Sequence, residues 1–155
     1  MNSEQLLNIV KTDPCLNLRV KGVYASNRLP QFVTQYPSAF IINTQPLPLP
    51  GEHWIAIIVH SPLRAEFFDS LGHTPADYNQ DIQNFLDKNS KRCYYKATRL
   101  QPRNSDLCGL YVLVFLIAKL CFKYSLNRVY ALFSSNNIQS NDVFVRSFMH
   151  NYLTH

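Results

Sequence analysis

The stretch HWIAIIVHSPLRAEFFDS, residues 53–70, decides the fold. Its first half, WIAIIVH at 54–60, is apolar on both faces, as expected of a strand buried within a sheet. Its second half, residues 64–70, carries AEFF before Asp69 and predicts a second strand, which Gly72 ends. Because the two strands are neighbours in the chain, we expect them to pair at the centre of a sheet.

Helices and further strands are predicted on both sides of this stretch. Asn2 or Ser3 caps a first helix that Pro14 ends, residues 39–44 form a short strand, and the prolines of 45–52 predict an irregular loop. Downstream, the patterns predict an amphipathic helix over 77–89, a strand over 93–98 and a buried helix over 108–122. Ser140 or Asn141 begins a last helix. The residues on its apolar side are Val143, Phe144, Phe148, Tyr152 and Leu153. Helices flanking a central mixed, largely antiparallel sheet define the α+β class.

Length and composition indicate one folded domain over 1–155. The 155 residues are 46% hydrophobic and only 16% charged, which excludes a disordered chain. The start, MNSEQLLNIVKTD, has acidic and amide residues where a secretory leader carries basic ones. The longest apolar run, 107–122, contains Lys119 and is shorter than the roughly 20 residues that cross a bilayer. We therefore expect an intracellular protein without a membrane partner.

The cysteines give no sign of a redox motif or a metal centre. They stand at positions 15, 93, 108 and 121, and no two of them form a Cys-x-x-Cys pair. His53 and His73 have no partner at the spacing of a zinc site either. We expect individually placed thiols and no metal or organic cofactor.

His53 and Cys108 are the residues best placed for chemistry. His53 stands where the proline-rich loop enters the strand 54–60, between solvent and core. Cys108 opens the apolar helix, and the positive end of the helix dipole favours thiolate over thiol. Taken singly, each has an ordinary alternative: a hydrogen-bonded histidine at a strand end, and a buried structural cysteine.

Asp69 and Gln101 complete a candidate catalytic set. Asp69 ends the strand expected to pair with the one after His53, so its carboxylate would accept the imidazole Nδ1–H and leave Nε2 facing the thiol. Gln101 lies seven residues before Cys108 and would form an oxyanion hole with the Cys108 backbone N–H. The four residues together predict a thiol nucleophile, a general base and acid, an orienting carboxylate and an oxyanion hole.

Positive charge is concentrated in one segment. The chain has 15 Lys and Arg against 10 Asp and Glu, a net charge of +5. Within 88–103 there is no acidic residue, and the basic ones are Lys88, Lys91, Arg92, Lys96, Arg99 and Arg103. This segment is the candidate surface for a polyanion, with a solvated charged face as the alternative.

The order His53-Trp54, Asp69, Gln101, Cys108-Gly109 resembles the adenovirus protease family, adenain, whose wider clan includes the Ulp/SENP SUMO proteases. The matching pieces are GEHWIAIIV, FFDSLG and QPRNSDLCGLYVLVFL, and the likeness extends to SEQLLNIVKTDPC near the start and FVRSFMHNYL near the end. The SUMO proteases typically have Asp directly before the nucleophile, where this chain has Leu107. Leu107 therefore favours the viral-type branch, which includes relatives of adenain from virus-like DNA elements. Asp69 stands where adenain usually has Glu and matches the wider clan.

This resemblance implies an adenain-like fold and a cysteine endopeptidase. Cys108 would be the nucleophile, His53 the general base and acid, Asp69 the orienter and Gln101 the oxyanion donor. Its substrates would be precursor capsid or core proteins, cleaved during virion maturation in the host nucleus or the virion.

The resemblance also implies two activators, DNA and a short basic peptide attached through a cysteine. The KRC segment would make Cys93 the point of attachment by a disulfide. The DNA contacts would be Lys91, Arg92, Lys96 and Arg99. A half-buried structural cysteine beside solvated lysines is the alternative interpretation of the same segment.

Two other functions stay open on the sequence. A deconjugating protease that removes SUMO or another ubiquitin-like modifier would use the same catalytic group. A non-enzymatic basic domain of a virion, or one associated with DNA, would have Cys108 and His53 as packing residues. Fast alkylation of Cys108 near neutral pH would argue against that last function, because the thiolate is the reactive form.

Overall fold

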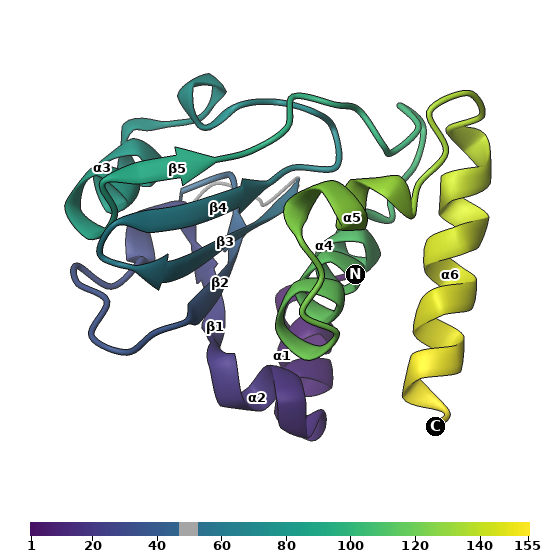
Figure 1. Ribbon diagram of the computed structural model, residues 1–155, viewed down its shortest axis with the longest axis horizontal. Helices are drawn as coiled ribbons and strands as arrows, with labels where there is room; N and C mark the ends of the chain where they lie inside the picture. Colours follow the sequence, from purple (N-terminus) through teal and green to yellow (C-terminus); the bar gives the residue numbers. More distant parts are fainter. Residues whose placement is uncertain (47–52) are drawn as a thin grey trace.

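A five-stranded sheet forms the centre of the computed structural model, which describes residues 1–46 and 53–155 (Figure 1). Its strands, in both chain and spatial order, are β1 (Val20–Ala25), β2 (Ser38–Asn43), β3 (Trp54–Ser61), β4 (Arg64–Phe68) and β5 (Arg92–Tyr94). The pairings β2–β3 and β3–β4 are antiparallel, whereas β1–β2 and β4–β5 are parallel. The α+β class and the mixed sheet are confirmed, with the antiparallel pairings confined to the central strands.

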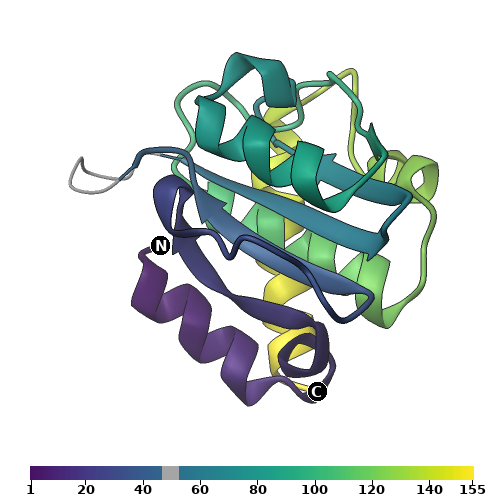
Figure 2. The same ribbon diagram turned by 90° about the vertical axis from the view of Figure 1, so that its left-hand side faces the viewer.

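Helices cover both faces of the sheet (Figures 1 and 2). One face carries α3 (Gln80–Asn89) and the other α4 (Cys108–Leu116), with α6 (Gln139–Leu153) packed on the outer side of α4. The remaining helical elements are α1 (Ser3–Thr12), α2 (Pro14–Arg19), α5 (Leu126–Ala131), the π-helix η3 (Ile117–Cys121) and the 3₁₀ turns η1 (Ser26–Arg28) and η2 (Pro75–Asp77). None of the helices in the described ranges has the length and apolar character needed to cross a membrane.

The alternation of side chains along β3 explains why this strand is apolar on both faces. Ala56 and Ile58 join the core cluster under α4, while Ile55 and Ile57 join the cluster under α3. All four side chains are fully buried. The cores under α3 and α4 share strands β3 and β4, so packing on both faces of the sheet fixes the positions of these two strands.

The predicted helix 108–122 forms, but it is α-helical only to Leu116. From Ile117 to Cys121 it continues as a π-helix, a wider turn that sequence periodicity does not indicate. Lys119 lies in this turn, and its Nζ contacts Glu66 Oε1 of β4 at 2.9 Å. The charged residue inside the apolar run is therefore paired within the protein.

Several boundaries differ from the sequence predictions. Pro14 occupies the first turn of α2, where its missing N–H is tolerated, so it starts a helix in addition to following one. The predicted strand 93–98 is reduced to Arg92–Tyr94, and Val143 and Leu153, predicted on the apolar side of α6, are exposed. The predicted loop 45–52 lies outside the described residues from position 47 onward.

The expectation of four individually placed thiols is wrong. Cys15 of α2 and Cys121 at the end of η3 form a disulfide, and only Cys93 and Cys108 are free. The two partners are 106 residues apart in the chain, and the packing of α2 against η3 brings them together. A pairing created by tertiary packing leaves no spacing signal in the sequence.

Candidate active site

His53 and Asp69 meet where the antiparallel pair β3–β4 ends. His53 immediately precedes β3, Asp69 immediately follows β4, and Ala56 of β3 is paired with Phe68 of β4. The start of one strand therefore lies beside the end of the other. His53 Nε2 contacts Asp69 Oδ1 at 2.6 Å, and the His53 carbonyl accepts a hydrogen bond from the Thr44 N–H at 3.0 Å.

The imidazole is turned the opposite way from the sequence prediction. Asp69 was expected to accept from Nδ1, but it holds Nε2. The nitrogen left for the thiol is therefore Nδ1, which is nearer the backbone of the strand. The pairing of His53 with Asp69 was predicted correctly. The orientation of the His53 ring depends on the distance between the start of β3 and Cys108, which the sequence does not give.

Cys108 is the first residue of α4 and is buried beside Trp54, the first residue of β3. Its sulfur accepts hydrogen bonds from the backbone N–H groups of Trp54 and Gly109 and interacts with the His53 ring. Burial on its own raises the pKa of the Cys108 thiol, but the His53 hydrogen bond and charge, with these two N–H groups, outweigh burial and lower it below the ordinary value. The thiolate is the form that this environment stabilises.

The pKa of His53 is raised to about 9. Burial lowers it, but hydrogen bonds and charge from Asp69 and Cys108 more than compensate. Asp69 is itself ionised: burial raises its pKa, while His53, Tyr78 and the Leu71 N–H lower it below its ordinary range. The Tyr78 hydroxyl donates to Asp69 Oδ2, and the Leu71 N–H donates to Oδ1 at 2.9 Å. The three groups therefore favour a thiolate–imidazolium–carboxylate arrangement.

Gln101 lies in the same cleft, but its side chain is hydrogen-bonded to Ser70, which follows β4, and to Ser105 of its own loop. Its Oε1 accepts from the Ser70 hydroxyl at 2.6 Å, and its Nε2 donates to the Ser105 carbonyl at 2.9 Å and to the Ser105 Oγ at 3.3 Å. The side chain is buried and its position is fixed from both sides. To donate to an oxyanion, Gln101 would have to exchange one Ser105 contact for the substrate.

The loop before Cys108 is anchored to the first turn of α6. Asp142 Oδ1 accepts from the Ser105 hydroxyl at 2.9 Å and from the Tyr111 hydroxyl at 2.7 Å. The buried Asn141 donates to the Leu100 carbonyl at 2.9 Å. These positioning residues were missed in the sequence, where Asn141 was noted only as a helix start, because polar residues in a first helical turn usually serve as caps.

A cleft of about 400 Å³ gives access to the sulfur. Its lining includes His53, Gln101 and Cys108, together with Met1, Leu71, Arg99, Arg103, Ser105 and Asp106. The Trp54 indole N–H donates to the Met1 carbonyl at 3.0 Å, and a Cβ on Gly109 would lie 3.2 Å from Met1 Cβ. Glycine after the nucleophile therefore leaves room for Met1 to form one wall of the cleft.

Cys93 lies away from this cleft, on β5, half-buried against the core under α3. Burial, with the nearby charge of Glu66, raises the pKa of its thiol to about 12. Cys93 is thus held protonated, in contrast to Cys108. This environment favours the packing interpretation of Cys93 over a thiol ready to form a mixed disulfide.

The basic residues follow β5 and the segment after it. Lys91 and Arg92 are exposed, and Lys96 lies over the Tyr130 ring at 5.8 Å. Arg99 donates from Nε to the Gln101 carbonyl at 3.0 Å and reaches the cleft. Within the described part of the chain, none of these four side chains forms an ion pair with a carboxylate. Their charge is available to a polyanion.

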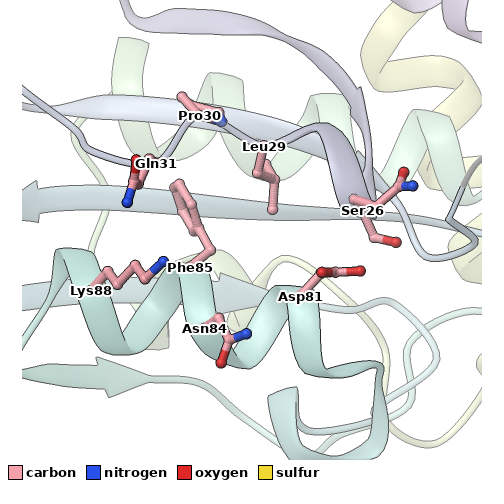
Figure 3. Close-up of a pocket in the computed structure, with 9 residues that line it drawn as sticks. Ser26, Leu29, Pro30, Gln31, Asp81, Asn84, Phe85 and Lys88 are labelled. Atoms are coloured by element: carbon pink, nitrogen blue, oxygen red, sulfur yellow. The ribbon is translucent and has the colours of Figure 1, made fainter.

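A second cavity, of about 190 Å³, lies between the segment 26–31 and α3 (Figure 3). It is lined by Asp81, Asn84, Phe85 and Lys88 of the helix and by none of the four predicted catalytic residues. Among the described residues, metal-ligand atoms gather at Asp13, Cys15 and Cys121, where the two sulfurs are joined in the disulfide. Neither place belongs to the cleft of Cys108.

Comparisons with known proteins bear on the fold alone. No protein-family model matches the chain, and no curated protein matches its sequence. Among solved structures, the chain is similar to the central domain of the uncharacterized protein Lpg1148 from Legionella pneumophila, with a TM-score of 0.50 and 13% identity. The similarity covers 98% of this chain and 94% of that one, so it concerns the arrangement of helices and strands over nearly the whole domain.

Proposed function

We propose that this chain is a cysteine endopeptidase with Cys108 as nucleophile, His53 as general base and acid, and Asp69 as the orienting carboxylate. One observation carries the proposal: His53 interacts with both the Cys108 sulfur and, at 2.6 Å, the Asp69 carboxylate, at the floor of an open cleft. A thiolate at a helix start, paired with an imidazolium that a carboxylate holds in place, is the arrangement that nucleophilic thiol catalysis requires.

Acylation follows from these positions. The Cys108 thiolate attacks the carbonyl carbon of a peptide bond, and the electron pair of the C=O bond moves onto oxygen. As the tetrahedral intermediate collapses, His53 gives its Nδ1 proton to the leaving amine and the C–N bond breaks. His53 then deprotonates a water molecule, and this water attacks the thioester. The C–S bond breaks, the carboxylic acid product leaves, and the Cys108 thiolate and the His53 imidazolium are restored.

The developing oxyanion would be met by the Cys108 N–H and by Gln101. The backbone N–H groups in the first turn of a helix have no partner within the helix. Gln101 is buried in the loop that leads to Cys108, with its Nε2 on Ser105. Each such donor is worth about 2.7–4 kcal/mol in comparable sites. Substrate binding would draw one N–H of Gln101 away from Ser105.

For the biological role, we extend the resemblance to adenain. The chain would cleave precursor capsid or core proteins during virion maturation, in the host nucleus or in the virion. The support is the order of His53, Asp69, Gln101 and Cys108, with Leu107 before the nucleophile. A protease that removes a ubiquitin-like modifier would use the same catalytic residues, so substrate identity separates the two roles.

Peptide cleavage tests this proposal directly. Wild type and Cys108→Ala would be assayed on peptides with apolar-x-Gly cleavage sites and on a folded ubiquitin-like modifier with a di-Gly tail. We expect cleavage of the peptides by wild type and loss of activity on the order of 10⁶-fold in Cys108→Ala, with folding unchanged. Cleavage of the modifier fusion alone would favour the deconjugating role.

Alkylation separates an enzyme from a non-catalytic domain. Cys108 and Cys93 are the two free thiols, so Cys93, with its raised pKa, is the internal control. Iodoacetamide should modify Cys108 much faster than Cys93 near neutral pH. Equal, slow modification of both thiols would mean that Cys108 is a packing residue and would remove the catalytic proposal.

DNA is retained as a proposed partner because Lys91, Arg92, Lys96 and Arg99, on β5 and the segment around it, form no ion pair with a carboxylate of the described residues. Neutralising Lys91, Arg92, Lys96 and Arg99 should reduce DNA affinity and flatten its dependence on log salt by about 0.9 for each DNA phosphate that the variant no longer neutralises. An affinity for DNA that does not vary with salt would remove this partner. The activating peptide stays a proposal without support from Cys93, and Cys93→Ser tests it by abolishing any disulfide-linked peptide.

A further inference from the structure

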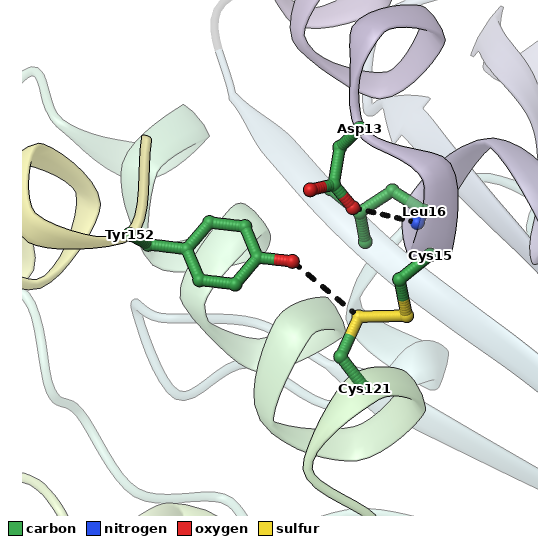
Figure 4. The surroundings of a disulfide bond; sticks show 5 residues. All are labelled: Asp13, Cys15, Leu16, Cys121 and Tyr152. Carbon is green, nitrogen blue, oxygen red and sulfur yellow. Dashed lines mark hydrogen bonds between the residues drawn. A yellow bond between two sulfur atoms is a disulfide. The ribbon is translucent and has the colours of Figure 1, made fainter. Parts of the chain in front are cut away.

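Asp13, Cys15 and Cys121 form a cluster of metal-binding groups far from the cleft (Figure 4). One carboxylate oxygen and the two sulfur atoms lie within 4.8 Å of one another. All three residues are partly buried. The sulfurs belong to segments 106 residues apart, held together by the packing of α2 against the π-helix η3.

The carboxylate of this cluster is already oriented. Asp13 caps α2, and its Oδ2 accepts the Leu16 N–H at 2.9 Å. The Tyr152 hydroxyl lies on the other side, donating to Cys121 Sγ at 3.8 Å (Figure 4). Tyr152 also interacts with the Asp13 carboxylate. Hydrogen bonds of this kind fix ligand orientation at metal sites.

We propose that, once the Cys15–Cys121 disulfide is reduced, the two thiolates and the Asp13 carboxylate bind one Zn²⁺ ion, with water in the fourth position. Reduction transfers two electrons and two protons from a dithiol, which closes into its own disulfide. The S–S bond breaks and two thiols form. Zn²⁺ then displaces the two thiol protons to solvent as the two Zn–S bonds form.

The donor set selects zinc over harder cations. Thiolates are soft ligands that Zn²⁺ accepts, whereas Ca²⁺ and Mg²⁺ require oxygen donors. In a tetrahedral site with Zn–S of about 2.3 Å and Zn–O of about 2.0–2.2 Å, donor atoms lie roughly 3.5–3.8 Å apart. The cluster can meet this requirement once the S–S bond is broken, because all three donor atoms already lie within 4.8 Å of one another.

The site would keep one structural link in two redox states. In an oxidising compartment the disulfide joins α2 to η3, and under reducing conditions, where disulfides are rare, the zinc ion would replace it. A solvent-open hollow of about 600 Å³ lies beside Tyr152, where Phe122 and Phe148 also line it. The sequence does not predict this site, because zinc ligands are recognised by short spacing and these two cysteines are 106 residues apart.

Metal titration of the full chain tests the site independently of peptidase activity. A Cys93→Ser/Cys108→Ala background leaves Cys15 and Cys121 as the remaining cysteines and removes the catalytic thiol. The protein is reduced with a phosphine, which becomes the phosphine oxide and adds no competing thiol. We expect the reduced protein to bind one equivalent of Zn²⁺, to show thiolate-to-metal charge transfer with Co²⁺, and to gain thermal stability on adding Zn²⁺. The oxidised protein should bind none.

Two variants identify the ligands. Cys121→Ser should abolish the charge-transfer band and the zinc-dependent gain in melting temperature. Asp13→Asn keeps both cysteines and a good helix cap, and should weaken binding by at least about tenfold. Circular dichroism checks that Cys121→Ser is folded. If it is not, the Zn²⁺ affinity of Asp13→Asn is the measurement that tests the site. The matched control is Asp77→Asn, which removes a carboxylate hydrogen-bonded to Thr74 at the start of η2. This variant should bind Zn²⁺ as tightly as the Cys93→Ser/Cys108→Ala background.

Two results would overturn the proposal. One is a reduced protein that binds no zinc equivalent although it stays folded. The other is binding that is equal in Asp13→Asn, Asp77→Asn and the background, which would mean that the carboxylate is not a ligand. Neither result affects the peptidase proposal, because the background has no catalytic thiol.

Discussion

Two histidine–carboxylate pairs lie toward opposite ends of the β3–β4 hairpin. At one end His53 Nε2 contacts Asp69 Oδ1 at 2.6 Å, and toward the other His60 Nε2 contacts Glu66 Oε1 at 2.5 Å. Both carboxylates are almost fully buried. The pairs differ in their third member, which is the Cys108 thiol at the first end and the Lys119 ammonium at the second.

The third member decides what each pair can do. At the first end, a nucleophile at the start of α4 faces an open cleft, and the histidine can transfer a proton. At the second, Lys119 Nζ contacts Glu66 Oε1 at 2.9 Å and neutralises the buried carboxylate, with Arg64 3.6 Å from the other oxygen. A histidine–carboxylate contact alone therefore identifies neither a catalytic nor a structural site.

The largest expected effect is a difference in kcat between Asp69→Asn at the first end of the hairpin and Glu66→Gln at the second. Replacing the carboxylate removes the charge that holds the His53 imidazolium, so kcat should fall on the order of 10⁴-fold, the loss known for the same change in a serine triad. Glu66→Gln makes the same chemical change at the other end and should leave kcat per folded molecule within about twofold. Steady-state kinetics on one peptide substrate compares them. Similar kcat values for Asp69→Asn and wild type would exclude Asp69 from the catalytic group.

Lys119→Met should reverse the pattern by lowering stability and leaving catalysis intact. Removing the ammonium leaves the buried Glu66 with only His60 and the more distant Arg64 as partners, and loss of one partner of a buried pair lowers the free energy of unfolding by up to about 3–5 kcal/mol. Urea denaturation measures this loss, and kcat/KM per folded molecule should be unchanged. Adding Glu66→Gln should recover much of the stability, because no unpaired charge is then buried. A single variant as stable as wild type would show that the Lys119–Glu66 ion pair is not a stabilising one.

The same pair contributes to the loss of stability in acid. Burial raises the pKa of Glu66, but hydrogen bonds and charge from His60 and Lys119 outweigh it and lower the pKa from 4.5 to about 2. Since the unfolded carboxyl binds protons more readily, this contribution is complete above about 4.5 and is lost as the pH falls toward 2. Lys119→Met should therefore weaken the pH dependence of the melting temperature in this range.

Gln101→Ala should have a smaller effect on catalysis than Asp69→Asn. Loss of one oxyanion donor lowers kcat by roughly 10²- to 10³-fold, with KM little changed. Because Gln101 is also hydrogen-bonded to Ser70 and Ser105, Gln101→Glu is the useful companion: it can still accept from Ser70 but has no N–H to donate. Gln101→Glu should lower kcat at least as much as Gln101→Ala, because its carboxylate also repels the developing oxyanion. Full activity of Gln101→Glu would mean that Gln101 serves only to hold the loop.

The hairpin was predictable because its information is local. The apolar runs at 54–60 and 64–70 and their closeness in the chain determine two buried antiparallel strands, and these bring His53 beside Asp69. The position of Cys108 followed from the long apolar helix that it opens. His53, Asp69 and Cys108 each stand at the boundary of a strand or helix, where the sequence changes between polar and apolar residues. This change predicts both where the strand or helix begins or ends and where the candidate catalytic residue lies.

The features that could not be predicted depend on packing between distant segments. The Cys15–Cys121 disulfide needs α2 against η3, and the anchoring of Ser105 needs the first turn of α6 beside the loop. The orientation of the His53 ring follows from where α4 places the sulfur. Lys119 was noted only as a charge that argues against a membrane helix, because nothing in its neighbourhood of sequence indicates the Glu66 partner.

The pH dependence of Cys108 alkylation provides the finest distinction between the two ends. In wild type, the thiolate should form below the ordinary thiol pKa, since His53 and two backbone N–H groups outweigh the effect of burial and lower it. Asp69 is a leading cause that raises the pKa of His53 to about 9, so Asp69→Asn should destabilise the imidazolium and move the onset of alkylation upward by about one to three pH units. The kcat/KM profile of wild type should correspondingly fall near pH 9, where His53 loses its proton.

Glu66→Gln is the control that makes this shift specific. It removes a carboxylate from a histidine on the same two strands, so any general effect of removing negative charge would appear in both variants. We expect its alkylation profile and its alkaline limb of kcat/KM to coincide with those of wild type, because Glu66 has no contact with the Cys108–His53 pair among the interactions of the described residues. Equal shifts in the two variants would mean that the charge of the whole sheet, and not the Asp69 contact, sets the reactivity of Cys108.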